Sequence, residues 1–387
     1  MVKDMIELGD VATYINGYAF KPKDRGKVGL PIIRIQDLTG NAYDLGFYDG
    51  EYPEKIEIND GDVLISWSAS LGVYVWNRGR ALLNQHIFKV VFDKVDIDKN
   101  YFVYAVSQKL VEMGMKTHGA TMKHIVKKDF DAMMIPYPSL NEQADIAINL
   151  NKVSNVIEAR KQELQLLDEL IKARFVEMFG DVKINPHKYK KNSIKSVLKT
   201  CEAGWSGNGT QRIRKDDEIA VLKVSAVTKG YFIPEECKVL DDQENIKKYV
   251  TPEKGDLLFS RANTREMVGA TAIVKEDYPS LILPDKLWKI KFRDNVNVFY
   301  MKYVLSSKSV RNQFSVVSTG TSGSMYNVSM DKFKAIEVPL PPIELQNQFA
   351  DFVHQVDKSK VAVQINKDTT QELLIIYIFT VNKYYHK

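Results

Sequence analysis

Two stretches of the chain carry side chains that suit the edges of DNA bases, and each follows a similar segment, GDVLIS (61–66) or GDLLFS (255–260). Arginine pairs well with O6 and N7 of guanine and asparagine with N6 and N7 of adenine, at roughly 1–3 kcal/mol of discrimination for each pair. The two frames match while the loop contents differ, which favours base recognition over the alternative of ordinary polar surface loops. The candidates are Trp67, Ser68, Ser70, Asn77, Arg78 and Arg80 in the first loop and Arg261, Asn263, Thr264 and Arg265 in the second.

A turn rich in glycine, serine and threonine forms a second kind of candidate site, KTHGATMKH (116–124) in the first half and STGTSGSMYN (318–327) in the second. Small residues let backbone N–H groups approach phosphates closely, and lysine or histidine adds positive charge or donors. A flexible connector is the alternative. The candidates are Lys116, His118, Thr121, Lys123 and His124, and then Thr321, Ser322, Ser324, Tyr326 and Asn327.

Further candidates lie near the start of each half, where Tyr18, Phe20 and Trp205 occupy loops that we interpret as equivalent. Core packing is the alternative for these aromatic residues. In PDKLWKI (284–290), Lys286 and Trp288 alternate along a predicted strand, so we expect Trp288 in the core and Lys286 towards DNA. The remaining candidates of this group are Lys21 and Arg212.

The sequence holds no motif for chemistry of its own. GWSGNG (204–209) neither follows a clear strand nor opens a helix, so we predict a loop and not a cofactor site. NPHKY (185–189) departs from the motif with which adenine methyltransferases hold a flipped base, and no phosphate-binding GxxxxGK[ST] segment occurs. We expect Asp62 and Asp256 to serve turns. The sequence therefore predicts a non-catalytic protein that binds no cofactor and no metal itself.

Composition limits the class of protein further. The chain has 387 residues, 44% hydrophobic and 27% charged, which is ordinary for a soluble protein of two or three domains. A net charge of +5 permits nucleic-acid binding without requiring it. Two cysteines without metal-ligand spacing, and no apolar run of signal or membrane length, predict a cytoplasmic protein. INPHKYKKNSIK (184–195) is interpreted as a solvated linker, with non-specific phosphate attraction as the alternative.

The elements that must position these residues occur twice. IPYPSLNEQADI (135–146) matches VPLPPIELQNQF (338–349) at an offset of 203 residues, and the two Gly-Asp segments match at 194. The drifting offset indicates loop insertions between two divergent copies of one unit. Each copy runs from short β-branched or aromatic strands through a helical stretch, a small-residue turn and a Pro-x-Pro pair to a long helix.

The two long helices have no reactive groups but a clear heptad pattern. We expect the first to start at Asn141-Glu142 after two prolines, to span about 35 residues, roughly 50 Å at 1.5 Å per residue, and to stop at Gly180. Lys360, Lys367 and Thr370 weaken the middle of the second. Antiparallel pairing with each other is the simplest way to bury both stripes, and packing of each on a domain is the alternative. The stripe residues are Ile146, Leu150, Val153, Ile157, Leu164, Leu167, Ile171 and Met178 in the first helix and Phe349, Val353, Val356, Val363 and Leu374 in the second.

This order of parts resembles the specificity subunit of type I restriction-modification systems, over essentially the whole chain. The resemblance rests on LPIIRIQDLT, GDVLIS, HGATMKHI, IPYPSLNEQADI and LLDELIKARFVEMFGD, and on GDLLFSRANT, LPDKLWKI and VPLPPIELQNQF. It implies an α+β fold with two mixed α/β target-recognition domains, related by a pseudo-twofold and held apart by two antiparallel coiled-coil helices. The C-terminal helix departs from the pattern, which leaves the end of the second spacer open.

The resemblance implies recognition domains at 1–138 and 182–341 and spacer helices at 139–181 and 342–387. It further implies that each domain reads one half of a bipartite double-stranded DNA site, with two methyltransferase subunits and restriction subunits as partners. S-adenosylmethionine, ATP and magnesium are then expected on those partners. A coiled-coil scaffold whose globular heads bind proteins is the alternative function; it predicts no salt-dependent DNA affinity.

Overall fold

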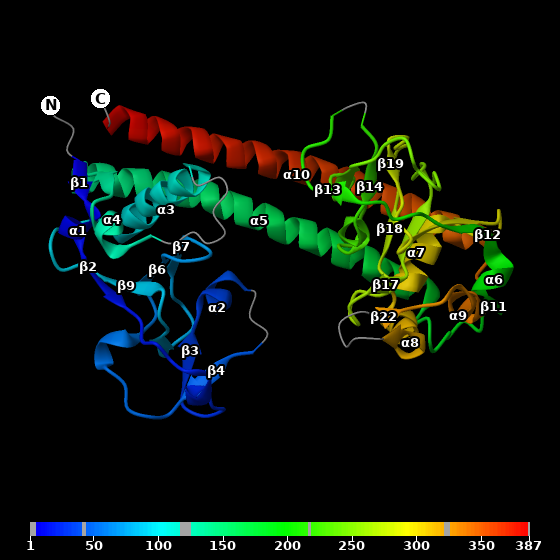
Figure 1. The fold of residues 1–387 in the computed structure, drawn as a ribbon, viewed down its shortest axis with the longest axis horizontal. Coiled ribbons are helices and arrows are strands. Elements are labelled where there is room, and N and C mark those ends of the chain that lie inside the picture. Colours follow the sequence, from blue (N-terminus) through cyan, green and yellow to red (C-terminus); the bar gives the residue numbers. More distant parts are fainter. Residues whose placement is uncertain (1–4, 41–43, 117–124, 216–217, 321–325, 386–387) are drawn as a thin grey trace. The chain divides into compact units, whose positions relative to one another are not determined.

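The computed structural model describes residues 5–40, 44–116, 125–215, 218–320 and 326–385 (Figure 1). The chain divides into two compact units. Unit 1 consists of Met1–Lys161 together with Ile365–Lys387, and unit 2 consists of Gln162–Gln364. Two long helices, α5 (Leu140–Phe179) and α10 (Ile343–Tyr385), therefore each contribute one part to each unit.

Unit 1 carries short strands and helices before the first part of α5. In chain order they are β1 Met5–Glu7, α1 Leu8–Val11, β2 Thr13–Asn16, η1 Pro22–Asp24, β3 Leu30–Ile33, α2 Ile35–Thr39, β4 Gly46–Tyr48, η2 Glu54–Ile56, β5 Glu57–Ile58, β6 Val63–Ser66, β7 Gly72–Val75, β8 Ala81–Leu83, β9 Ile87–Val91, α3 Lys99–Lys116, α4 Lys127–Asp131 and β10 Met134–Pro136.

Unit 2 carries its own short strands and helices between the second part of α5 and the first part of α10. Its elements are β11 Lys191–Ser193, α6 Ile194–Val197, β12 Leu198–Ala203, β13 Gly209–Thr210, β14 Ala220–Leu222, η3 Val224–Val227, β15 Cys237–Leu240, β16 Leu257–Ser260, β17 Ala262–Asn263, β18 Thr271–Ile273, β19 Leu281–Ile282, β20 Leu287–Phe292, α7 Val298–Ser306, α8 Lys308–Val317, β21 Thr319–Gly320, β22 Tyr326–Asn327, α9 Met330–Ala335 and β23 Glu337–Pro339.

The central sheet and the closing ladder are built the same way in both units, whereas the second sheets have the orders β4-β3-β8-β5 and β13-β15-β14-β19. The central antiparallel sheet has the order β2-β9-β6-β7 in unit 1 and β12-β20-β16-β18 in unit 2. Beside it lies a second sheet with one parallel pair, β3 with β8 or β14 with β19. A two-stranded ladder joins the first strand of each unit to its last, β1 to β10 and β11 to β23. The duplication predicted from the sequence is therefore a duplication of topology.

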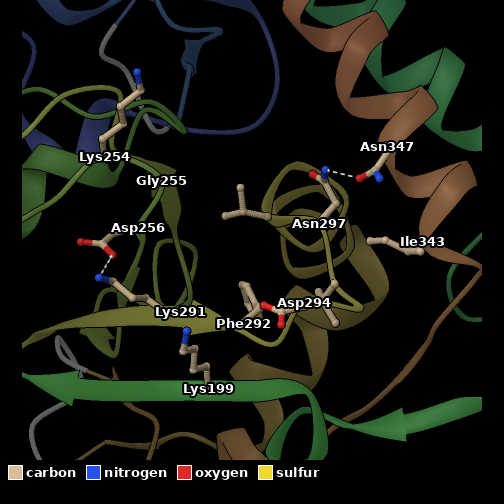
Figure 2. Close-up of a pocket in the computed structure, with 12 residues that line it drawn as sticks. Lys199, Lys254, Gly255, Asp256, Lys291, Phe292, Asp294, Asn297, Ile343 and Asn347 are labelled. Carbon is tan, nitrogen blue, oxygen red and sulfur yellow. Dashed lines mark hydrogen bonds and ion pairs between the residues drawn. The ribbon is translucent and has the colours of Figure 1, made fainter.

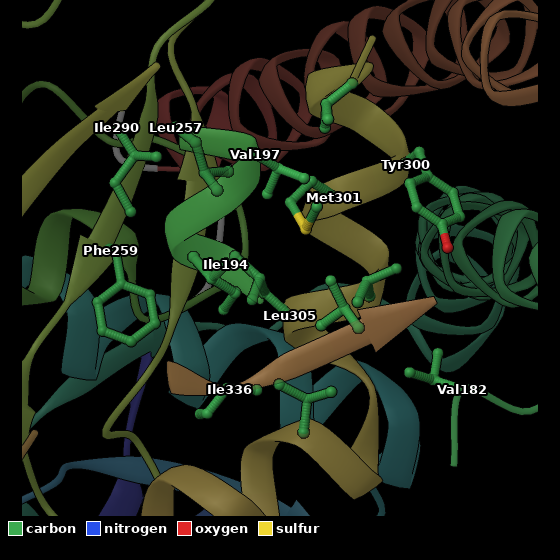
Figure 3. Packing of buried hydrophobic residues seen from close by; sticks show 14 of the residues in the cluster. Val182, Ile194, Val197, Leu257, Phe259, Ile290, Tyr300, Met301, Leu305 and Ile336 are labelled. Carbon is green, nitrogen blue, oxygen red and sulfur yellow. The ribbon is translucent and has the colours of Figure 1, made fainter. Parts of the chain in front are cut away.

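Each central sheet separates two hydrophobic cores, because side chains alternate along a strand. In β16, Leu257 and Phe259 enter the larger core beside the helices, while Leu258 faces the core of the second sheet. Figure 3 shows Leu257, Phe259 and Ile290 with Tyr300 and Met301 of α7 and with α6 in the larger core. In unit 1, Ile65 and Leu64 of β6 divide in the same way. All four residues of β6 and of β16 are buried, which explains their uninterrupted apolar sequence.

A buried glutamine explains the motif at the start of each long helix. The carboxamide of Gln143 accepts a hydrogen bond from Asp98 N (2.8 Å) and donates one to Pro138 O (2.8 Å). Gln346 makes the matching bonds with Asn297 N (2.9 Å) and Pro341 O (2.8 Å). Both glutamines are fully buried, so these bonds satisfy polar groups that water cannot reach. This clasp fixes each long helix to the turn before α3 or α7.

The long helices pair antiparallel in unit 2. Lys360 Nζ lies 2.6 Å from Asp168 Oδ1, and the ring of Phe349 lies 5.4 Å from that of Phe175 and 5.7 Å from that of Phe179. Residue numbers thus rise along α5 as they fall along α10. In unit 1, Leu374 and Ile378 of α10 pack against the core that contains Ile146, Ala147 and Leu150.

The heptad residues named from the sequence are buried or half-buried throughout both helices. The pattern missed Phe175 and Phe179, which are 5% and 4% exposed and which are more buried than the half-buried Met178. The predicted start of this helix at Asn141-Glu142 is confirmed to within one residue, because α5 begins at Leu140, where Ser139 and Glu142 form a capping box. The helix has 40 residues and is longer than the expected 35. Gly180 follows its last residue at φ +74°, a left-handed conformation that suits a helix stop.

Two local predictions were wrong. The segment 184–195 is not simply a linker, because Lys191–Ser193 is strand β11 of the closing ladder and Ile194 begins α6. Lys286 does not alternate with Trp288 along one strand, because β20 begins at Leu287 and Lys286 lies in the turn before it. The expected core position of Trp288 is confirmed, at 2% exposure. Among the described residues, the helices include none with the length and apolar character of a membrane span.

Candidate DNA interface

The residue after β6 and the residue after β16 occupy the same backbone frame. Trp67 N donates to His86 O (3.2 Å), and Trp67 O accepts from Ile125 N (3.0 Å). In unit 2, Arg261 N donates to Lys286 O (3.0 Å), and Arg261 O accepts from Val328 N (2.9 Å). The same three segments therefore meet at the same end of each central sheet, and different side chains stand at equivalent places.

A glycine followed by an aromatic residue completes this frame in both units. Tyr18 N donates to Leu83 O and Trp205 N to Leu283 O, each at 2.8 Å. A Cβ atom on Gly17 or Gly204 would lie 2.0 Å from Asn84 O or 1.8 Å from Leu283 O, so only glycine allows this close approach. The predicted equivalence of these two loops is confirmed, whereas contact of their aromatic rings with DNA stays a prediction.

In unit 2 the structure brings five of the predicted residues together. Asn263 in β17 pairs with Tyr326 in β22, and Asn327 pairs with Ala262. Trp205 is half-buried against Val221, Leu240 and Ile282. Lys286 is half-buried, and its amine makes no hydrogen bond or ion pair within the described chain. Arg261, Asn263, Lys286, Tyr326 and Asn327 thus form one cluster at the end of β16, which we call the unit 2 reading end.

The equivalent place in unit 1 carries aromatic side chains. We call Trp67, His86 and Tyr18 the unit 1 reading end. The Trp67 indole stacks on Phe88 (ring centroids 5.5 Å apart) and donates from Nε1 to Asn16 Oδ1 (3.3 Å). His86 packs edge-on against Trp67 (4.9 Å) and has φ +72°, a left-handed conformation that is uncommon outside glycine. Tyr18 is 45% exposed and contacts Phe20, which contacts Tyr48.

The first loop predicted from the sequence is divided by the structure. The strand pair β6–β7 runs from Ser66 opposite Gly72 to Val63 opposite Val75, so the hairpin turn holds only Trp67 to Leu71. Ser70 is exposed in that turn, and Ser68 is 6% exposed. Asn77, Arg78 and Arg80 lie beyond β7 at the opposite end of the sheet, where Trp76 N bonds to Asp62 O. The expectation of one continuous recognition loop was therefore wrong.

Internal partners hold both arginines of this second group. Arg78 donates to Asp37 O (3.0 Å) and lies over the Trp76 ring (4.4 Å). Arg80 donates to Glu57 from Nε (2.7 Å) and Nη2 (2.8 Å), and these bonds lower the pKa of Glu57 to about 2. Lys21 is exposed at the start of η1, where its backbone N–H bonds to Asp24.

Other predicted residues of unit 2 lie outside its reading end or are held by protein groups. Both terminal nitrogens of Arg212 bond to Glu218 (2.8 and 2.6 Å), which lowers the pKa of Glu218 to about 2. Thr264 and Arg265 are exposed in the turn after β17, and Arg265 Nε donates to Ser315 (3.1 Å). The predicted residues of the two small-residue turns mostly lie outside the described residues, namely His118, Thr121, Lys123, His124, Thr321, Ser322 and Ser324. The side chain of Lys116 also lies outside them.

Sequence reasoning missed three residues at the reading ends. His86 carries no motif, and its left-handed backbone is invisible in the sequence. Ser206 and Asp285 hydrogen-bond to each other across unit 2, and Asp285 also contacts Arg261. The sequence PDKLWKI contains Asp285 but does not show that it lies beside Arg261. The two residues meet because β16 and β20 pair in antiparallel register.

The opposite end of the unit 2 sheet carries a hollow of about 490 Å³ (Figure 2). It opens beside Gly255, Lys199, Lys291 and the start of α7, and it is not continuous with the reading end. Lys291 bonds to Glu253 (2.6 Å) and lowers the pKa of that carboxyl to about 2, whereas burial raises the pKa of Asp256. Asp62 and Asp256 serve turns as expected, since each accepts from the backbone three residues earlier, Asn59 N or Glu253 N.

The described chain holds no cluster of three or more histidine, cysteine or acidic side chains that could bind a metal ion. Burial raises the pKa of Cys201 to about 11 and also raises that of Cys237, so neither is a reactive thiolate near neutral pH. What the two reading ends offer is a hydrogen-bonded backbone that displays polar and aromatic side chains.

Comparison with known proteins decides the family. The profile of the type I restriction modification DNA specificity domain matches residues 3–169 and again residues 177–374. The chain belongs to this family. The two matches each cover one copy of the repeated fold, so the specificity domain occurs twice in the chain.

Relatives of this specificity-domain chain carry the same description. It is 22% identical over 378 residues to the type I restriction enzyme EcoBI specificity subunit of Escherichia coli, covering 91% of this chain and 78% of that one. It is 23% identical to the MjaVIII specificity subunit of Methanocaldococcus jannaschii, covering 81% and 77%. The alternative of a protein-binding scaffold is not favoured by these relatives.

Solved structures support the fold. An S subunit of a type I restriction-modification system from M. genitalium is similar with a TM-score of 0.50 and 10% identity, over 97% of this chain and 94% of that one. A chain from a study of complex assembly in the type I system has a TM-score of 0.51 and 15% identity, over 97% and 96%. The predicted α+β class, with two mixed α/β domains and two long antiparallel helices, is confirmed.

Proposed function

We propose that the chain is the DNA-reading subunit of a type I restriction-modification complex and recognises a bipartite double-stranded site. One observation carries the proposal: the specificity-domain profile matches both copies of a fold that places different side chains at equivalent ends of two central sheets. Each reading end would contact one half-site. Base contacts specify sequence, while phosphate contacts from surface lysines and backbone N–H groups position the protein.

The partners and cofactors belong to the same proposal. Two methyltransferase subunits would dock on α5 and α10 and supply the S-adenosylmethionine chemistry, and restriction subunits would use ATP and magnesium. The chain itself would bind no cofactor and catalyse no step. Residues 1–138 and 182–341 would be the two recognition domains, with the segments 139–181 and 342–387 as spacers.

The experiment uses the full chain co-expressed with its methyltransferase subunits in a host whose methylated sites are then sequenced. We expect one bipartite motif to be methylated. Replacing residues 1–138 with the corresponding domain of another specificity subunit should change one half of that motif and leave the other half unchanged. Identical methylation with and without the chain would refute the proposal, and a change in both halves would refute independent reading by the two units.

Binding measurements provide a second readout. If the complex neutralises several phosphates, log K should fall linearly with log salt with a slope near −0.9 for each phosphate contacted. The scaffold alternative predicts no such slope. A complex that binds its methylated motif and a scrambled duplex equally at every salt concentration would contradict sequence-specific recognition.

A further inference from the structure

Arg261 is the one arginine among the five residues that define the unit 2 reading end. Its backbone is bonded on both sides, to Lys286 and to Val328. Its side chain is 30% exposed, so the guanidinium is neither buried nor extended into solvent. A side chain fixed in this way loses little conformational freedom on binding, which favours specific contacts over loose ones.

An acidic residue holds one edge of this guanidinium. Nε donates to Asp285 O (2.9 Å), and Nη2 lies 3.5 Å from Asp285 Oδ2. Asp285 is itself fixed, because its carboxylate accepts a hydrogen bond from Ser206 and its backbone N–H donates to Ser206 Oγ (3.2 Å). Three chain segments, at 206, 261 and 285, are thus tied together around one side chain.

The outer end of the same guanidinium remains available. Arginine has five N–H donors, and the contacts with Asp285 use those on the Nε side. Within the described chain, Nη1 and the second hydrogen of Nη2 have no acceptor. Those two groups form a planar fork whose spacing matches O6 and N7 of guanine.

The other arginines singled out in unit 2 lack this combination. Arg212 directs both Nη1 and Nη2 at Glu218, so its fork is already occupied. Arg265 is anchored only by a hydroxyl, that of Ser315, on an exposed turn. Only Arg261 among these three has an acidic anchor on one edge and an open fork on the other.

We propose that Arg261 reads a guanine in the major groove of the half-site that unit 2 recognises, with Asp285 and Ser206 as positioning residues. The inference rests on the proposed function, and it names the base that is recognised and the residue that recognises it. In unit 1 the equivalent residue is Trp67, whose indole N–H is directed at Asn16. The two half-sites therefore differ in chemistry at this place, since unit 1 offers no guanidinium there.

The test compares variants of the full chain in complex with its methyltransferase subunits, using a set of duplexes that each carry one base change in the methylated motif. Arg261→Ala should reduce discrimination at a single G·C pair of one half-site by roughly 5- to 150-fold and leave every other position unchanged. Arg261→Lys keeps the charge but not the planar fork, so it should lose the same discrimination and keep the salt slope.

Asp285→Asn distinguishes positioning from a general structural role. It should reduce discrimination at the same G·C pair by less than Arg261→Ala does, and Asp285→Glu should restore part of it. A structural role alone would weaken binding to all duplexes equally. Arg293→Ala is the matched control, because Arg293 donates to Leu198 O (3.1 Å) near the opposite end of the sheet and should not alter base preference.

Thermal melting of each variant identifies any that do not fold. If Arg261→Ala does not fold, the base preference of Arg261→Lys decides the test. If Arg261→Ala weakens all sequences alike and lowers the salt slope by about one phosphate, Arg261 contacts the backbone and the inference is overturned. If Arg261→Lys and Arg261→Ala both keep the base preference of the wild type, and the complex still selects its motif, the inference is overturned. The proposed function is then unaffected. A wild-type chain that confers no motif overturns both.

Discussion

At the end of the central sheet, unit 1 presents Trp67 and His86 where unit 2 presents Arg261 and Lys286. The backbone bonds around the two pairs are the same, and so are the glycine turns at Gly17 and Gly204. The frame depends on main-chain hydrogen bonds and close approach, which do not depend on these side chains. A fold held in this way can change what it recognises without changing its framework.

The two units also differ in the side chains that pack against the long helices. Tyr101 and Tyr300 make the same bond to a proline carbonyl, Pro136 O (2.8 Å) or Pro339 O (2.7 Å), which aligns α3 with α7. In this alignment Val103 of unit 1 corresponds to Lys302 of unit 2. Unit 2 also gathers Phe175, Phe179, Tyr303 and Phe349 against each other, whereas the core of unit 1 has Ile146 and Leu150 at the helix.

The aromatic cluster should give the largest difference between the units. Phe349→Ala removes a fully buried ring that contacts Phe175, Phe179 and Tyr303, and it should lower the free energy of unfolding of unit 2 by about 3–5 kcal/mol. Ile146→Ala at the equivalent place in unit 1 should lower stability by about 2 kcal/mol. Urea unfolding monitored by hydrogen exchange assigns each loss to its unit, and equal losses would contradict the comparison.

The glutamine clasps should behave alike. Gln143→Ala and Gln346→Ala each remove a buried carboxamide and leave a partly buried backbone N–H, Asp98 N or Asn297 N, without its acceptor, and each should destabilise its own unit by about 1–3 kcal/mol. The matched control is Gln348→Ala, because Gln348 is exposed on the same helix. Chemical denaturation measures all three. A clasp variant as stable as Gln348→Ala would show that water replaces the lost bonds.

The exchange between Val103 and Lys302 predicts a smaller, pH-dependent effect. Burial lowers the pKa of Lys302 to about 8, and the charges of Asp357, Lys360, Asp168 and Lys275 act on it as well. An unfolded lysine keeps its proton up to a pKa near 10.4, so the unfolded state binds more protons than the folded state between about pH 8 and 10. The stability of unit 2 contributed by this group therefore rises with pH through that window.

Lys302→Val should remove this rise and raise the free energy of unfolding near pH 7 by about 1 kcal/mol, because no charged amine is then buried. Val103→Lys should lower the stability of unit 1. Thermal melts at pH 7 and pH 9.5 compare the variants with the wild type. An identical pH dependence in wild type and Lys302→Val would mean that Lys302 remains fully charged in the folded protein.

Features defined by local sequence could be predicted, namely the duplication, the buried Gly-Asp strands, the helix stop at Gly180 and the core position of Trp288. The division of the first recognition loop could not, because it depends on the hairpin turn at Ala69, a non-glycine residue with φ +58°. The anchors of Arg261 and Arg80 come from segments 24 and 23 residues away, which only the sheet register identifies. Phe175 and Phe179 were missed because they depart from the alternating steps of the heptad.

The discontinuity of unit 1 has a consequence for the order in which the chain folds during synthesis. Unit 2 ends at Gln364, so all of its residues have been made before the last part of unit 1, Ile365–Lys387, is added. Until Leu374 and Ile378 emerge from the ribosome, the core that contains Ile146 and Leu150 lacks two of the residues that pack against it. The unit that is synthesised first is thus completed last, and a nascent chain exposes a hydrophobic surface for most of the time in which the second unit is made.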